Sequence, residues 1–109
     1  MWLHEHIIEE SDNFMRVADA NESVEFEIWG SAPVQAFGVV SGREFYFRAR
    51  HEGWCCEVAD DCGQLPSDGF ANTTGFSRSG LYENASYISL RAALKIIDLC
   101  LREYLSLGA

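Results

Sequence analysis

Apolar and polar residues alternate through much of the stretch from residue 33 to residue 60, PVQAFGVVSGREFYFRARHEGWCCEVAD. A period of two is typical of β-strands that bury one face. Two glycine-containing pairs, Ser41-Gly42 and Glu52-Gly53, are typical centres of two-residue hairpin turns, in which glycine supplies a positive φ. The pattern therefore predicts three antiparallel strands joined by two tight turns.

These turns set a register that pairs Phe37 with Tyr46 in the first hairpin and Arg50 with Cys55 in the second. Successive side chains then point to opposite faces of the sheet. One face is almost entirely apolar and is the expected core: Val34, Ala36, Gly38, Val40, Phe45, Phe47, Ala49, Trp54, Cys56 and Val58. The other face mixes aromatic, charged and polar residues: Gln35, Phe37, Val39, Glu44, Tyr46, Arg48, Arg50, Cys55 and Glu57.

A fourth strand is predicted over residues 23–29, in which apolar residues alternate with Glu25, Glu27 and Trp29. The turn-like residues 30–33 join it to the next strand, so the four strands are expected to form a meander. An odd connection, of three or five residues, keeps the apolar side facing inward. Trp29 then lies on the same outer face as Phe37.

A C-terminal helix is predicted over residues 86–107, with a polar stripe and a wide apolar face suited to covering the sheet. The stripe consists of Arg91, Lys95, Asp98 and Arg102. An N-terminal helix is predicted over residues 2–18, where apolar residues have roughly helical spacing, although His4 and His6 would also suit a short strand. Between sheet and helix, residues 60–83 form a long irregular connection, with residues 69–74 as one option for an extra strand.

The expected architecture is thus α+β, a two-layer sandwich in a single domain over residues 1–109. An apolar content of 48% supports a folded core. The net charge of -9 makes nucleic acid a poor direct partner, because binding its backbone needs clustered lysine and arginine. Eight acidic residues but only Arg16 among the basic ones fall in residues 1–27. The sequence has neither a basic-then-apolar leader nor a membrane-length apolar run, which predicts a cytoplasmic protein that does not bind membranes.

Candidate chemistry in the sequence is weak. The spacing of histidines and cysteines fits no metal-binding motif, and the glycine-rich connection has no phosphate-binding pattern. Cys55 is expected near Arg48 and Arg50, which would favour a thiolate, but parity places His51 on the opposite face, where it cannot act as a base. We therefore expect no catalytic residues, no metal and no cofactor.

The favoured function is protein binding without catalysis. Aromatic residues beside arginines are enriched at interface hot spots, and the outer face gathers five such residues, Trp29, Phe37, Tyr46, Arg48 and Arg50. The acidic N-terminal segment, with Glu9, Glu10 and Asp12, would steer a basic protein partner. The chain would be a small acidic interaction protein, such as an inhibitor, an immunity protein or a chaperone-like protein, with a homodimer as one arrangement.

Two alternative functions remain open at this point. One is a small-molecule-binding domain or small enzyme with a pocket between residues 60–83 and the sheet, lined by Trp54, Phe70 and Phe76. The other is an acidic mimic of nucleic acid that blocks a basic groove. The outer face also has two purely structural explanations: the N-terminal helix covers it, or cross-strand pairs such as Phe37 with Tyr46 and Arg48 with Glu57 simply stabilise the sheet.

Overall fold

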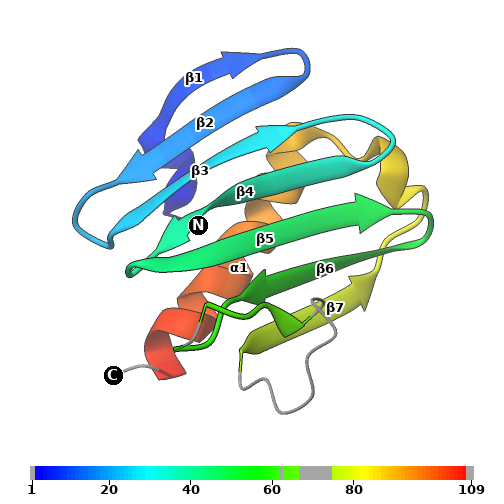
Figure 1. The fold of residues 1–109 in the computed structure, drawn as a ribbon. Helices are drawn as coiled ribbons and strands as arrows, with labels where there is room; N and C mark the ends of the chain where they lie inside the picture. Colours follow the sequence, from blue (N-terminus) through cyan, green and yellow to red (C-terminus); the bar gives the residue numbers. More distant parts are fainter. Residues whose placement is uncertain (1, 62, 67–74, 108–109) are drawn as a thin grey trace.

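The computed structural model describes residues 2–61, 63–66 and 75–107. They form one antiparallel meander of seven strands, each paired with the next along the chain, followed by a single α-helix (Figure 1). The elements are η1 (Leu3–His6), β1 (Ile7–Ser11), β2 (Phe14–Asp19), β3 (Val24–Trp29), β4 (Val34–Val40), β5 (Arg43–Arg50), β6 (Gly53–Val58), β7 (Phe76–Leu81), η3 (Ala85–Tyr87) and α1 (Leu90–Leu107). The predicted α+β class, the antiparallel meander and the C-terminal helix are confirmed.

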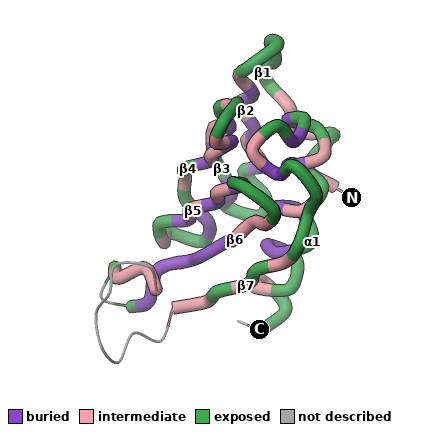
Figure 2. Tube along the Cα trace, turned by 90° about the vertical axis from the view of Figure 1, so that its right-hand side faces the viewer, coloured by how far each residue is buried: buried purple, intermediate pink, exposed green. Residues whose placement is uncertain are grey.

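The core lies between α1 and one broad face of the sheet (Figure 2). Alternate residues along the strands supply its sheet half, including Phe26, Phe45 and Phe47, whose side chains are at most 2% exposed. Leu94 and Ile97 of α1 are fully buried against them. The amphipathic helix therefore covers the apolar face of the sheet, as its sequence pattern predicts.

The prediction of an N-terminal helix was wrong, because only the 3-10 turn η1 precedes a hairpin formed by β1 and β2. A turn at residues 12–13 joins the two strands, and every second residue of β2 is buried: Met15, Val17 and Asp19. Its apolar residues fit a helical spacing as well as an alternation. Pairing of all six residues of β2 with β3 decides in favour of the strand.

The register between β4 and β5 is confirmed, with Phe37 opposite Tyr46. The register predicted between β5 and β6 was wrong by two residues, because the turn is centred on residues 51–52 and pairs Arg50 with Gly53 and Arg48 with Cys55. His51 adopts the positive φ of 58° that was expected of glycine. A two-residue shift leaves every side chain on its predicted face, so the division into core and outer faces still holds.

Part of the long connection is regular, since β7 pairs along its whole length with β6. The option of a strand at residues 69–74 lies outside the described residues. At the other end of this segment, α1 is capped by Ser89, whose Oγ accepts a hydrogen bond from the Ala92 N–H at 3.0 Å.

Asp98 does not belong to a solvent-facing polar stripe, as its helical position predicted, because its side chain is fully buried. Its Oδ2 accepts hydrogen bonds from the backbone N–H groups of Trp2 and Leu3, both at 2.8 Å. Arg102 lies 2.9 Å from its Oδ1 as an ion pair within the helix. Asp98 thereby fastens the start of the chain to α1, on the core side of the sheet.

Candidate functional site

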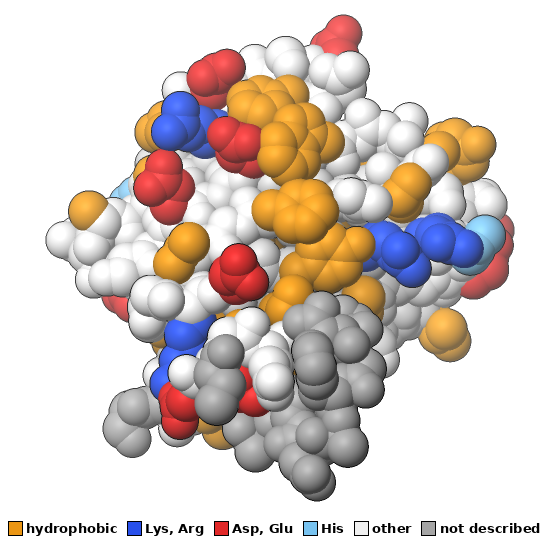
Figure 3. Space-filling model, in the orientation of Figure 1, with side chains coloured by type: hydrophobic (Ala, Val, Ile, Leu, Met, Phe, Trp, Pro, Cys, Tyr) orange, Lys and Arg blue, Asp and Glu red, His pale blue; other side chains and the backbone are white. Residues whose placement is uncertain are grey.

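Four aromatic side chains form a continuous row across the outer face of the sheet, one from each of β2, β3, β4 and β5 (Figure 3). Their ring centroids are separated by 6.0 Å from Phe14 to Trp29, 5.8 Å from Trp29 to Phe37, and 4.9 Å from Phe37 to Tyr46. Neighbouring strands bring these rings together because their residues are directly opposite or diagonal in the register. We call these four residues the aromatic ladder.

No described helix covers the aromatic ladder, because both α1 and the N-terminal turn lie on the opposite side of the sheet (Figure 2). Trp29 is 40% exposed and Phe37 is 46% exposed. Glu57, further along the same face on β6, is only 3% exposed, so the face is covered at that position. The first structural explanation of the outer face, coverage by an N-terminal helix, is therefore excluded.

Charged groups of opposite sign flank the aromatic ladder, as Figure 3 shows. Arg48 and Arg50 of β5 lie on one side, and Arg50 Nε donates a hydrogen bond to His51 Nε2 at 2.8 Å. The other side carries four glutamates, from β1, β3 and β5, and one arginine from β2: Glu9, Glu25, Glu27, Glu44 and Arg16. Of these, Glu25 is paired with Arg16, at 3.2 Å.

The three acidic residues predicted to steer a partner do not act as one group. Glu9 is exposed on the outer face, opposite Arg16, whereas Asp12 lies in the turn between β1 and β2. Glu10 points to the helix side, where Arg91 donates to its two carboxylate oxygens at 2.8 and 2.7 Å. These hydrogen bonds lower the pKa of Glu10 and join β1 to α1, so the charge of Glu10 is already paired within the molecule.

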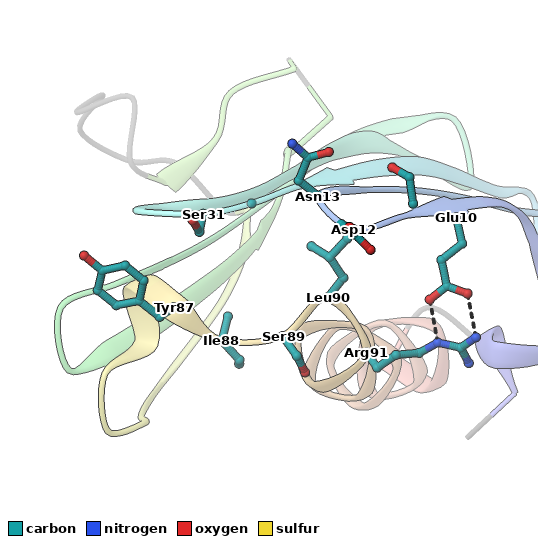
Figure 4. Close-up of a pocket in the computed structure, with 11 residues that line it drawn as sticks. Glu10, Asp12, Asn13, Ser31, Tyr87, Ile88, Ser89, Leu90 and Arg91 are labelled. Atoms are coloured by element: carbon teal, nitrogen blue, oxygen red, sulfur yellow. Dashed lines mark hydrogen bonds and ion pairs between the residues drawn. The ribbon is translucent and has the colours of Figure 1, made fainter.

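The Glu10–Arg91 pair borders a cleft of about 390 Å³ between the β1–β2 turn, the segment after β3 and the start of α1 (Figure 4). Asp12, Asn13 and Tyr87 also line this cleft. Arg91 is the one basic residue that lines the cleft, and its charge is neutralised by Glu10, one of the two acidic lining residues. The cleft therefore presents little unpaired charge to a ligand.

A second hollow, of about 330 Å³, lies at the end of β5 beside the turn to β6. Arg48, Arg50, His51 and Cys55 are among its lining residues. Burial is the main cause that raises the pKa of the Cys55 thiol, and Glu57 adds to it, while Arg48 opposes the rise only in part. The thiol is therefore held protonated, which makes it a weaker nucleophile at neutral pH.

Two other parts of the predicted chemistry can be compared with the structure. Across residues 2–61, 63–66 and 75–107, no three His, Cys, Asp or Glu side chains lie together as a metal-binding group. Of the residues expected to line a pocket beside the long connection, Phe76 packs on Tyr104 of α1 and Trp54 stacks on Phe47, with centroids 5.4 and 6.4 Å apart. Phe70 lies outside the described residues.

The sequence placed five of the outer-face residues together but missed Phe14, which it assigned to a helix. The available signal was the pair Asp12-Asn13, which is typical of turns, followed by the short alternation of Met15, Arg16 and Val17. Within the described part of the chain, no helix is long and apolar enough to span a bilayer. Neither a protein-family model, nor a curated protein, nor a solved structure matches the chain.

Proposed function

We propose that this chain is a protein-binding module without catalytic activity, and that its partner docks on the outer sheet face between β2 and β5. The observation that carries the proposal is the exposed aromatic ladder. Aromatic pairs stabilise a sheet by about 0.5–1.5 kcal/mol each, but rings that are shielded from water do this equally well. Trp29 and Phe37 instead leave 40% and 46% of their surface in water.

The residue types on this face support a protein partner. Tryptophan, tyrosine and arginine are the types most enriched at hot spots, and Trp29, Tyr46 and Arg48 lie close together in the register. No ion pair among the described residues involves Arg48 or Arg50. The Arg48 guanidinium, and the N–H groups of Arg50 beyond the Nε that bonds His51, can therefore pair with carboxylates of a partner.

The test compares capture of partners by the full chain and by the double variant Trp29→Ala/Arg48→Ala. The immobilised proteins are exposed to an extract of the native host, and bound proteins are quantified by mass spectrometry. We expect the variant to retain its partner at a level at least about tenfold lower, because loss of two hot-spot residues costs several kcal/mol of binding free energy.

The control for this test is Tyr87→Ala/Lys95→Ala, which removes an exposed aromatic residue and an exposed cation away from the outer sheet face. Thermal unfolding verifies that both variants are folded. If the outer-face variant captures the same partners as the wild type, at the same level, the proposal is wrong.

A further inference from the structure

We infer that the partner on this face is a second copy of the chain, bound face to face about a two-fold axis that runs along the aromatic ladder. The inference rests on the proposed function, because it uses the same surface. In a two-fold contact each copy presents the same patch, so the patch must be complementary to itself. The outer sheet face meets this condition in the arrangement of its charges.

The aromatic ladder lies between two oppositely charged borders of the outer face (Figure 3). Rotation by 180° about an axis along the ladder places the arginine side of one copy over the glutamate side of the other, on both sides of the axis. None of the ion pairs among the described residues involves Arg48, Arg50, Glu9, Glu27 or Glu44. Apart from the Arg50 Nε that bonds His51, these groups are available for pairing between copies.

The ladder itself would lie against its own counterpart. Trp29 and Phe37, which are exposed in one copy, would be buried between two stacked sheets. The molecule measures 37 × 32 × 18 Å along its principal axes, so a broad face is comparable in area to the roughly 800 Å² per partner that stable interfaces bury. The dimer would have four layers, with α1 on each outside.

The net charge of -9 on each copy opposes this association at long range. At physiological salt the Debye length is about 8 Å, so contacts at the interface outweigh repulsion between more distant charges. We therefore expect a dimer whose population rises with protein concentration. The measurement is made at an ionic strength of about 0.15 M.

The experiment uses two charge-reversed variants of the full chain. Arg48→Glu/Arg50→Glu makes both borders acidic, and Glu27→Arg/Glu44→Arg makes the acidic border more basic. Sedimentation equilibrium of the wild type should show a mass rising with concentration toward twice 12.2 kDa. Each variant alone should dissociate at least about tenfold more readily, because like charges then face each other.

An equimolar mixture of the two variants should restore a dimer, since the acidic borders of one now face the basic borders of the other. A general loss of folding cannot produce this rescue. The control Lys95→Glu changes charge on the exposed side of α1 and should dimerise like the wild type.

A wild type that stays monomeric up to about 1 mM overturns the inference. So does a dimer that survives both reversals, or a mixture without rescue. The proposed function is tested separately. If the wild type is monomeric but Trp29→Ala/Arg48→Ala captures less of a host protein than the wild type does, the face binds a different partner and only the self-association is wrong.

Discussion

Asp19 shows how a carboxylate is kept ionised inside this fold. Its side chain is 4% exposed and accepts hydrogen bonds from Trp2 Nε1 at 2.5 Å and from the Asn21 N–H at 3.0 Å, with His6 Nε2 3.3 Å away. Burial by itself raises the pKa of Asp19, but the hydrogen bond from Trp2, the attraction of His6 and the backbone N–H groups together lower it. The charged form is therefore the one that stabilises the native state.

A lowered pKa in the folded state predicts how stability depends on pH. The contribution of Asp19 is present above the ordinary aspartate pKa of about 3.9 and is lost as the pH falls through the lower folded value. We expect Asp19→Asn to destabilise the protein at pH 7, and this deficit to shrink as the pH falls below about 4. Urea unfolding of the wild type and Asp19→Asn, at pH values from 7 to below about 4, measures this deficit.

The matched control is Asp12→Asn, which changes an exposed aspartate in the β1–β2 turn. Its stability should follow that of the wild type at every pH. A deficit for Asp19→Asn that stays constant down to acid pH would show that hydrogen bonding by the neutral side chain, and not the charge, is what matters.

Among the elements, the central strand β4 packs closely against β3 because of one glycine. Gly38 is the register partner of Phe26 on β3 and of Phe45 on β5, and those two rings meet edge to face at 5.4 Å over it. A Cβ at this position would collide with the Glu25 carbonyl oxygen and with the Phe26 Cβ. The glycine allows two large side chains on flanking strands to pack together.

We expect Gly38→Ala to lower the free energy of unfolding by about 1–3 kcal/mol, because overpacking forces the backbone or the rings to move. Gln35→Ala on the outer face of the same strand is the control and should change it by less than about 0.5 kcal/mol. Denaturant unfolding of both variants measures this. Equal stability of the two would mean that β4 relaxes away from Phe26 at little cost.

The elements also show which parts of the fold the sequence could predict. Strands β3 to β6 carry clear alternation and local turn signals, so their faces were predictable, and with them five of the outer-face residues. In β7, Arg78 and Gly80 occupy positions on the core side and obscure the alternation. Arg78 is tolerated there because it stacks 4.4 Å from the Phe76 ring centroid and pairs with Glu103 at 2.7 Å, contacts that no local pattern reveals.

For the molecule as a whole, a hydrogen bond between residues far apart in the sequence is also one of the most buried. The meander joins each strand to its neighbour along the chain, whereas Asp98 reaches back over 95 residues to the Leu3 N–H. Spacing within the helix predicted a solvent-facing Asp98. Helical spacing cannot reveal the backbone donors that bind Asp98, because they belong to residues 2 and 3. This long-range partner explains why that prediction was wrong.

We expect Asp98→Ala to lower the free energy of unfolding by about 2–4 kcal/mol, because the buried Leu3 N–H loses its acceptor and the charged hydrogen bonds disappear. Amide hydrogen exchange should accelerate at Trp2 and Leu3 before the central strands open. Lys95→Ala, one turn earlier on the exposed side of α1, should leave both measurements unchanged. Unaltered exchange at Leu3 in Asp98→Ala would contradict the assigned role.

The bond between Asp98 and Leu3 has a consequence for how the protein is made. During synthesis, β3 to β6 can pair in order as they leave the ribosome, since each needs only its predecessor. The 3-10 turn η1 cannot be fastened until residue 98 has emerged, which happens after every strand of the sheet has been made. The turn η1 is thus made before every strand of the sheet and is secured after all of them.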